Sequence, residues 1–447
     1  MIDAQASSRR AWVVDVDMGY GHSRAAFALR DLAGGEVVTA NNYHGIPASD
    51  RKVWTETRSA YEFVSRLKPV PLIGSMLFSV MDDLQRIPAF YPRRDLSAPN
   101  VQLRSIYHEL NRGFGKHLID QLAKHPVPLV TTFFTTAFAA DTYDYPGDIY
   151  CVTTDADISR SWAPMDPKRS RIKYFASNGR VQERLKLYGV REENIFLTGF
   201  PLPKNLIGGI ESPFAKQQLR SRICNLDQRG VFMGLYGKIL TDEFGEDFCK
   251  PPEQRHPLTV LYSVGGAGAQ RRLGVEIMQG LRHKIARREV RLILSSGTRK
   301  DVAQYYRAAA LDLGLKDLLG DTLQLPVYDT RAAYFAGFSQ TLETTDILWT
   351  KPSELSFYTG VGLPIVIAPP IGSQEEFNQV WLQHVGGGIP QGEPKYASEW
   401  LFDWIDSGGM ARLAWSGYAE APTHGTYRIE DIVLGRKSQL PTLPLVV

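Results

Sequence analysis

Two glycine-rich turns contain the residue types best suited to chemistry in this sequence. The first is MGYGH at residues 18–22, and the second is VGGAGAQRR at residues 264–272; each follows an apolar run and precedes residues of helical composition. Glycine permits a tight turn and a close approach of the backbone, and the free N–H groups at the start of a helix favour an anion. Both turns are therefore candidate phosphate-binding sites, although a connection without a ligand is the alternative for either turn alone.

His22 is the side chain of the first turn that could accept a proton. At a helix N-terminus the positive potential disfavours the imidazolium form, and a neutral imidazole can act as a base. The alternative is a histidine that caps the helix or bonds a backbone carbonyl. A nicotinamide-binding fingerprint is disfavoured, because Arg24 stands where the third glycine of that motif is expected.

Short β-rich runs alternate with helical patterns around these turns. In the first half the runs are residues 11–16, 35–40, 127–134, 148–154, 172–177 and 194–199. In the second half they are residues 258–264, 290–296, 322–328, 346–350 and 364–369. The alternation predicts two α/β halves, each a parallel sheet with helices on both faces. Since ligands of such sheets bind beyond the carboxyl ends of the strands, we expect the two halves to face each other across a cleft.

Length and composition fit this interpretation. The 447 residues suit two domains, and 43% hydrophobic with 22% charged residues is ordinary for globular proteins. A formal net charge of +3 gives no support for a nucleic-acid binder. The sequence contains no apolar run of about 20 residues, so we expect no membrane span.

The three cysteines are far apart, and none lies in a CxxC or CxxH motif. This distribution of Cys151, Cys224 and Cys249 predicts neither a disulfide framework nor a zinc site. The first 19 residues lack the apolar segment of a signal peptide. We therefore expect a cytoplasmic protein.

The order of several weak motifs resembles one enzyme family. GYGH is followed by TTDAD, SWAP, KYFASNGRVQERLKLYGV and IFLTGFPLP in the first half, and by VLYSVGGAGAQ, TDILWTKPSELSFYTGVGLPIVIAPPIGSQEEFNQVWL and GGGI in the second. This order is similar to that of the GT-B glycosyltransferases related to monogalactosyldiacylglycerol synthase, processive diacylglycerol glucosyltransferase and the peptidoglycan N-acetylglucosaminyltransferase. The resemblance covers residues 13–389, with a gap at 207–255.

The resemblance implies the GT-B fold, in which two Rossmann-like domains face each other across a cleft. It also implies an inverting sugar transfer from a nucleotide diphosphate sugar, expected to be a UDP-sugar, to a hydroxyl acceptor. The nucleotide sugar is a co-substrate, so no separate cofactor and no metal are expected. The expected domains are an N-terminal acceptor domain (1–203), a linker or insert (204–257), a C-terminal donor domain (258–420) and a tail packing back on the N-terminal domain (421–447).

Carried over by position, the resemblance assigns roles to individual residues. His22 is the implied general base for the acceptor hydroxyl, and Asp155 is implied to orient the acceptor or His22. The implied acceptor-side residues are Gly19, Tyr20, Gly21 and Trp162. The implied donor-side residues are Gly265, Gly266, Gly268, Lys351, Ser353, Glu354, Gln374, Glu375 and Asn378. Backbone donors at the second helix would stabilise the negative charge of the leaving diphosphate.

Two features need a separate interpretation. The glycine pair that the family has after Lys-Pro is replaced here by Ser353 and Glu354. Asp155-x-Asp157 resembles a carboxylate pair that holds a divalent metal, but it lies in the first half, away from the predicted donor half. We therefore expect no metal there, and a helix N-cap is the alternative role for Asp155.

Residues 51–124 are the expected acceptor side, with twelve basic and seven acidic residues among aromatics and prolines. In lipid-glycosylating relatives this region meets the membrane, so the resemblance implies a peripheral membrane contact and a lipid among the candidate acceptors. A solvated face over a hydrophobic core is the alternative. The interspersed acids disfavour a nucleic-acid patch.

Two other functions stay open. A sugar-nucleotide epimerase on the same architecture would use acidic residues at the cleft and need no acceptor. A non-catalytic GT-B scaffold that binds a nucleotide or sugar is motivated by Ser353 and Glu354.

Overall fold

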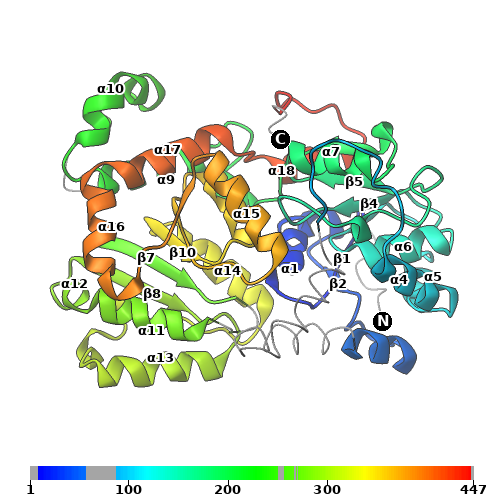
Figure 1. The fold of residues 1–447 in the computed structure, drawn as a ribbon, viewed down its shortest axis with the longest axis horizontal. Helices are drawn as coiled ribbons and strands as arrows, with labels where there is room; N and C mark the ends of the chain where they lie inside the picture. Colours follow the sequence, from blue (N-terminus) through cyan, green and yellow to red (C-terminus); the bar gives the residue numbers. More distant parts are fainter. Residues whose placement is uncertain (1–8, 57–86, 250–255, 266–267, 269, 444–447) are drawn as a thin grey trace. The chain divides into compact units, whose positions relative to one another are not determined.

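The computed structural model describes residues 9–56, 87–249, 256–265, 268 and 270–443. The chain divides into two units: the first comprises Met1–Pro203, Ile371–Asn378 and His424–Val447, and the second comprises Lys204–Pro370 and Gln379–Thr423. Within the described ranges each unit contains one six-stranded parallel sheet accompanied by helices (Figure 1). The two sheets confirm the predicted α/β class with two Rossmann-like halves.

The first sheet changes its strand order at the first strand. Its strands are β1 (Trp12–Asp15), β2 (Val38–Thr39), β3 (Leu129–Thr131), β4 (Ile149–Val152), β5 (Lys173–Ala176) and β6 (Ile195–Leu197). They lie in the order β2-β1-β3-β4-β5-β6, with Val13 of β1 opposite Val130 of β3. The chain runs from β1 to β2 on one side and continues with β3 on the other side. Such a reversal is the position where doubly wound sheets bind ligands.

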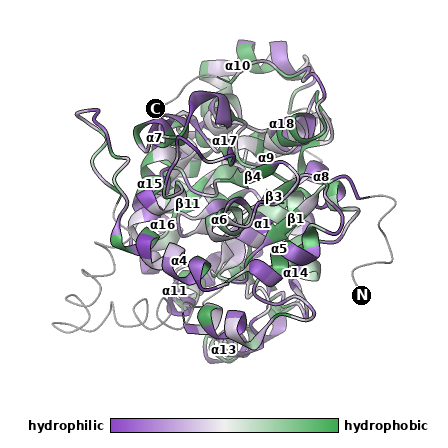
Figure 2. Ribbon diagram, turned by 90° about the vertical axis from the view of Figure 1, so that its right-hand side faces the viewer, coloured by the Kyte–Doolittle hydropathy of each residue, from purple (hydrophilic) through white to green (hydrophobic). Residues whose placement is uncertain are grey.

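Alternate residues of β1 belong to two hydrophobic layers, as the two-residue period of a strand requires. Trp12 and Val14 lie in one cluster with residues of α4 (Val101–Asn111), α5 (Lys116–Leu122), α6 (Phe134–Thr142) and α7 (Gly179–Leu187). Val13 lies in another cluster with residues of α1 (Tyr20–Ala28) and α18 (Gly425–Val433). Figure 2 shows hydrophobic residues on β1 and β3 and more hydrophilic ones on α7. The C-terminal helix α18 therefore covers part of the first sheet.

The second sheet repeats this topology. Its strands are β7 (Leu258–Ser263), β8 (Val290–Ser295), β9 (Leu323–Gln324), β10 (Ile347–Thr350), β11 (Ile365–Ile367) and β12 (Gly388–Pro390). They lie in the order β12-β11-β10-β7-β8-β9, with Tyr262 of β7 opposite Trp349 of β10. The order reverses between β7 and β10, as it does between β1 and β3 in the first sheet. The two glycine-rich turns thus follow the first strand of each sheet, next to its reversal.

The helices between α7 and α18 lie in the second half of the chain, and the first residues of one of them, α15, belong to the first unit. They are α8 (Lys204–Ile207), α9 (Pro213–Leu226), α10 (Val231–Phe244), α11 (Arg271–Gly280), α12 (Arg282–Ala286), α13 (Lys300–Asp312), α14 (Arg331–Leu342), α15 (Ser373–His384), α16 (Ala397–Asp406) and α17 (Gly409–Glu420). Short 3-10 segments are η1 (Arg30–Ala33), η2 (Arg160–Trp162), η3 (Glu192–Asn194), η5 (Lys316–Leu318), η6 (Glu354–Val361) and η7 (Pro394–Tyr396). Leu219, Ile223 and Leu226 of α9 are fully buried in the core of the second unit. Residues 204–249 therefore contribute to that core.

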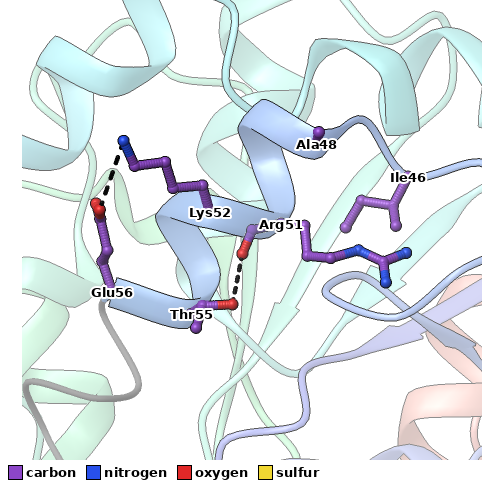
Figure 3. A pocket seen from close by; sticks show the side chains of 6 residues that line it. All are labelled: Ile46, Ala48, Arg51, Lys52, Thr55 and Glu56. Carbon is purple, nitrogen blue, oxygen red and sulfur yellow. Dashed lines mark hydrogen bonds and ion pairs between the residues drawn. The ribbon is translucent and has the colours of Figure 1, made fainter.

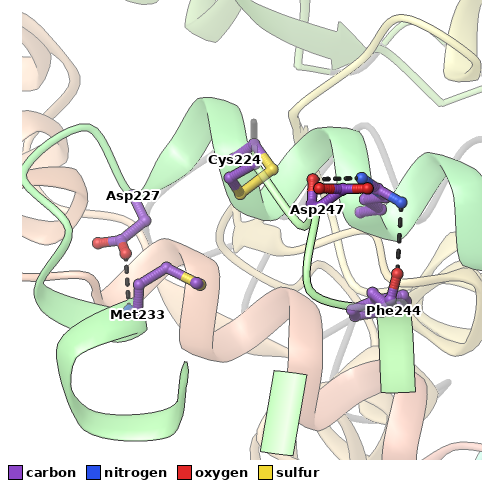
Figure 4. Close-up of a disulfide and its surroundings, with 7 residues drawn as sticks. Cys224, Asp227, Met233, Phe244 and Asp247 are labelled. Atoms are coloured by element: carbon purple, nitrogen blue, oxygen red, sulfur yellow. Dashed lines mark hydrogen bonds between the residues drawn. A yellow bond between two sulfur atoms is a disulfide. The ribbon is translucent and has the colours of Figure 1, made fainter. Parts of the chain in front are cut away.

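A disulfide joins Cys224 of α9 to Cys249, with Cα atoms 5.3 Å apart (Figure 4). The prediction that the cysteines form no disulfide is wrong for this pair. Their separation of 25 residues matches no short motif, and the helical hairpin of α9 and α10 brings them together. Asp227 supports the same hairpin, because its carboxylate accepts hydrogen bonds from the backbone N–H groups of Phe232 and Met233 at 3.0 and 2.8 Å. Cys151 is free and buried.

The described part of the chain contains no helix that is both long enough and apolar enough to span a bilayer. The predicted peripheral contact falls partly outside this part, because residues 57–86 are not among those described. That contact and the cytoplasmic location stay predictions.

Asp346 is a fully buried carboxylate at the start of β10. Its Oδ2 accepts hydrogen bonds from Asn225 Nδ2 and from the N–H of Thr259, both at 2.8 Å, and His256 Nδ1 lies 3.6 Å away. Burial raises the pKa of Asp346 to about 6, although His256 and the two hydrogen bonds act in the opposite direction. The unfolded chain should titrate this group near its ordinary pKa of about 3.9.

Because folding raises the pKa of Asp346, the folded state binds this proton more tightly than the unfolded state. The associated stability is complete below about pH 4 and is lost as the pH rises through about 6. We therefore expect the free energy of unfolding of the wild type, relative to that of Asp346→Asn, to fall by roughly 3 kcal/mol between about pH 4 and pH 7. Urea denaturation of both proteins across this range measures the difference. A difference that does not vary with pH would contradict the assignment.

Candidate functional site

The first candidate site begins where β1 passes into α1. Gly19 precedes the helix with a φ of 130°, a conformation that strongly favours glycine. Tyr20 starts the helix and is buried, and Gly21 and His22 complete its first turn. His22 is half-buried in this turn. The imidazole is therefore placed at the N-terminal end of a helix, as the sequence predicts.

The hydrogen bonds of His22 define its tautomer. His22 Nδ1 lies 2.7 Å from the carbonyl oxygen of Thr132, which can only accept a hydrogen bond. Nδ1 therefore carries the proton, and in the neutral ring the lone pair is on Nε2. The hydroxyl of Thr154 is a weaker second neighbour of Nδ1, at 3.4 Å. The bond to a backbone carbonyl, which is the alternative role predicted for His22, is therefore present, and it leaves Nε2 as the ring nitrogen that can accept a proton.

Aromatic rings surround the imidazole. Phe133 meets it edge-on with ring centroids 4.9 Å apart, and the ring of Trp162 lies at 6.2 Å. Trp162 is the last residue of η2, where its carbonyl accepts a hydrogen bond from Tyr174 at 2.8 Å. The structure thus brings together His22 and Trp162, two residues that were predicted from separate motifs.

Thr132 and Phe133 contact His22, and the order of the motifs does not identify them. They directly follow β3, which lies beside β1 across the reversal of strand order. Because carboxyl ends of parallel strands meet at one edge of a sheet, residues after β1 and β3 must lie near each other. The sequence could have indicated Thr132 and Phe133, because TTFF stands at the end of the third β-rich run, residues 127–134.

Asp155 and Asn378 contact each other in the first unit. Asn378 Nδ2 donates to Asp155 Oδ1 at 3.0 Å, and Asn378 Oδ1 accepts from the N–H of Ala156 at 2.6 Å. Asn378 is fully buried, and Asp155 is half-buried. The family pattern places Asn378 on the donor sugar, whereas the observed contacts place its amide on the loop that follows β4.

Asp157, the second acid of TDAD, pairs with arginines. Its carboxylate accepts hydrogen bonds from Arg184 Nε and Nη2 at 2.8 and 2.7 Å and from Arg180 Nε at 3.0 Å. The side chains of Asp157 and Arg184 are both fully buried. Guanidinium groups occupy both oxygens, so the alternative of a metal-binding pair does not fit. Among the residues described, no group of three or more His, Cys, Asp or Glu side chains is arranged to hold a metal ion.

The other predicted donor residues of α15 lie at its start. Glu375 Oε2 accepts a hydrogen bond from the N–H of Ile371 at 2.7 Å, which closes the turn before the helix. Gln374 lies beside Gly372, because a Cβ added to that glycine would be 3.5 Å from Gln374 Oε1. Their contacts with a donor sugar stay predictions.

The second candidate site lies at the reversal of the second sheet. Gly265 follows β7 and Lys351 follows β10, and these strands are neighbours. A Cβ added to Gly265 would be 2.9 Å from Lys351 Cε, so the lysine side chain crosses directly over the glycine. The N–H of Gly268 donates to the carbonyl of Gly265 at 2.8 Å. A glycine-rich turn and a cation therefore meet here, whereas Gly266 lies outside the described residues.

Ser353 and Glu354 form the turn that replaces the glycine pair of the family. The N–H of Ser353 donates to the carbonyl of Lys351 at 2.9 Å, and η6 begins at Glu354. Glu354 is only 7% exposed. Its carboxylate is placed at the start of a helical segment, where negative charge is favoured. Its role toward a nucleotide stays a prediction.

Arg299 is a cation near the second turn that sequence reasoning missed. A Cβ added to Gly268 would be 3.6 Å from Arg299 Nη1. Asp301 accepts from Arg299 Nε and Nη2, both at 2.9 Å, which orients the guanidinium. Arg299 follows β8, the neighbour of β7, so the ends of adjacent strands again indicate the location.

Two cavities adjoin the helical residues 48–56. The larger, of about 610 Å³, is open and is lined by Ile46, Ala48, Arg51, Lys52, Thr55 and Glu56 (Figure 3). The smaller has a volume of about 10 Å³. It is lined by Ala40, Asp50, Trp54, Phe114, Gly115, Leu118, Thr135, Thr136 and Ala139. Its volume is comparable to the space that one water molecule needs. Four of the residues that line the larger cavity, Arg51, Lys52, Thr55 and Glu56, belong to the predicted acceptor side.

No protein-family model matches the chain, and no curated protein matches it. Among solved structures, the chain is similar to S. aureus MnaA in its UDP co-structure, with a TM-score of 0.48 and 12% identity over 97% of this chain and 99% of that one. It is also similar to UDP-GlcNAc 2-epimerase from Neisseria meningitidis bound to UDP-GlcNAc, with a TM-score of 0.45 and 10% identity over 95% of this chain and 100% of that one. For Acinetobacter baumannii MurG the TM-score is 0.45 and the identity 12%, over 95% of this chain and 99% of that one.

Proposed function

We propose that this protein is an inverting GT-B glycosyltransferase that moves a sugar from a UDP-sugar to a hydroxyl acceptor. The observation that carries the proposal is the 2.7 Å hydrogen bond from His22 Nδ1 to the carbonyl of Thr132. It fixes the tautomer in which Nε2 can take a proton, at the end of the sheet where ligands bind.

The proposed reaction is a single displacement. The oxygen of the acceptor hydroxyl attacks the anomeric carbon, and the bond between that carbon and the diphosphate oxygen breaks. The proton of the hydroxyl passes to His22 Nε2, and the electron pair of the broken bond leaves with UDP. A positioned base contributes typically about 10²–10⁴-fold to such a step.

The second glycine-rich turn is the proposed diphosphate site. Lys351 crosses Gly265 at the reversal of the second sheet, and Arg299 lies beside Gly268. Cations and backbone N–H groups held in place before the reaction stabilise the charge of the leaving diphosphate without reorganising. Because these groups already supply positive charge, the proposal includes no metal.

The test is a calorimetric titration of the protein with uridine, thymidine, guanosine and adenosine diphosphates, with and without magnesium. We expect selective binding of UDP that magnesium does not change. Lys351→Ala should weaken UDP binding by about ten- to a hundredfold, because it removes a charge-assisted hydrogen bond. Lys316→Ala changes an exposed lysine of the same unit and should leave binding unchanged.

The reaction assay follows with the nucleotide that binds. Release of UDP that depends on a hydroxyl acceptor, with lipid hydroxyls tested first, would support the transferase. Conversion of the UDP-sugar to an epimer without an acceptor would instead identify a sugar-nucleotide epimerase. Failure of every nucleotide to bind would favour the non-catalytic scaffold, for which the turn at Ser353 and Glu354 is the motivating feature.

A further inference from the structure

Asn378 holds the loop after β4 through both ends of its amide. Its Oδ1 accepts from the N–H of Ala156 at 2.6 Å, and its Nδ2 donates to Asp155 Oδ1 at 3.0 Å. The side chain of Asn378 is fully buried, and its bond to Ala156 is shielded from water, whereas the bond to Asp155 is partly buried. One amide therefore fixes both the main chain at residue 156 and the direction of the neighbouring carboxylate.

The opposite side of this loop is held by residues that follow β5. Ser177 Oγ donates to the carbonyl of Asp155 at 2.6 Å, and Asn178 Nδ2 donates to the carbonyl of Ala156 at 3.0 Å. These two bonds hold only the main chain, whereas Asn378 holds the main chain and also donates to the carboxylate of Asp155. Loss of the Nδ2 donor of Asn378 alone would thus leave the main-chain bonds of the loop in place but release the contact to the carboxylate.

The held loop also reaches the predicted base. Thr154 immediately precedes Asp155, and its hydroxyl lies 3.4 Å from His22 Nδ1. Asn378 is therefore connected to the imidazole through two adjacent residues of one loop. Gln374 and Glu375 precede Asn378 by one turn of α15, so the helix assigned to the donor also holds the loop beside the base.

We propose that Asn378 is a positioning residue, which orients Asp155 and the loop beside His22, rather than a residue that reads the donor sugar. The proposal rests on the proposed transferase function for its catalytic consequence. Its structural part concerns the environment of His22 and can be measured without any substrate.

The first variant is Asn378→Asp. It keeps an oxygen that can accept from the N–H of Ala156 but replaces the donor Nδ2 by a carboxylate oxygen facing Asp155. Two facing carboxylates repel each other, so the side chain of Asp155 must turn away or bind a proton. The exchanged pair, Asp155→Asn with Asn378→Asp, restores one donor and one acceptor. Gln383→Glu adds the same charge at an exposed site of α15 and is the matched control.

The first measurement is the ¹⁵N NMR spectrum of the histidine ring nitrogens, with the signals of His22 identified by their loss in His22→Asn. We expect Asn378→Asp to shift these signals and the exchanged pair to return them toward the wild-type positions. Gln383→Glu should leave them unchanged. Unchanged His22 signals in Asn378→Asp would overturn the proposal, and so would failure of the exchanged pair to return them.

The second measurement uses sugar transfer under the conditions established for the wild type. Asn378→Asp should lower kcat at least tenfold and leave the KM for the UDP-sugar within twofold. A residue that reads the sugar would instead raise that KM, which would overturn the proposal. Shifted His22 signals in a protein that binds no UDP would contradict the proposed transferase but support the positioning role, so the two failures are distinguishable.

Discussion

Replacing His22 with asparagine is expected to lower the rate of sugar transfer by about 10²–10⁴-fold and to leave UDP binding unchanged. The amide nitrogen of asparagine can take the place of Nδ1 and donate to the carbonyl of Thr132, so the local hydrogen bond is retained. The variant lacks an atom equivalent to Nε2 and cannot take the proton of the acceptor. Steady-state kinetics with saturating acceptor measures the loss, and calorimetry measures UDP affinity.

The control for this variant is His44→Asn, because His44 is exposed on the same unit. It should transfer sugar at the wild-type rate. An undiminished rate in His22→Asn would remove the base assignment, and weakened UDP binding would show that His22 acts on the donor.

The central strands could be predicted from the sequence, because they are buried on both sides and are therefore continuously apolar. The run at 148–154 contains β4 (Ile149–Val152), and the run at 290–296 contains β8 (Val290–Ser295). At the sheet edges the predictions were poorer: residues 35–40 yield only Val38–Thr39, and Gly388–Pro390 was not predicted as a strand. An edge strand pairs on one side only, so its composition is less constrained.

The candidate site could be predicted only in part, because its residues are brought together by the order of the strands. His22 was identified from its turn, but Thr132 and Thr154 lie 110 and 132 residues further along the chain. They lie near His22 because β3 is next to β1 in the sheet and β4 is next to β3. No local sequence pattern predicts this order of the strands. Asn378 shows a second reason why the prediction is partial. Its motif suggests a contact with a ligand, but the sequence does not show that its amide also donates to Asp155.

Replacing Asp157 with alanine is expected to lower the free energy of unfolding by about 3–5 kcal/mol. Its carboxylate receives two hydrogen bonds from Arg184, at 2.8 and 2.7 Å, and both side chains are fully buried. The variant leaves the guanidinium of Arg184 buried without its counter-charge, so the cost of removing that charge from water is no longer offset. Urea denaturation compared with the wild type measures the loss.

The matched control is Asp166→Ala, which removes an exposed ion pair with Arg169 whose side chains are 56% and 90% exposed. It should cost less than about 1 kcal/mol, because water screens such a pair. A cost for Asp157→Ala as small as that of Asp166→Ala would contradict the structural role. If Asp157 held a metal with Asp155, its loss would instead make UDP binding insensitive to magnesium in a protein of nearly normal stability. The buried arginine pair predicts a large loss of stability instead, and UDP binding that magnesium changes neither in the wild type nor in the variant.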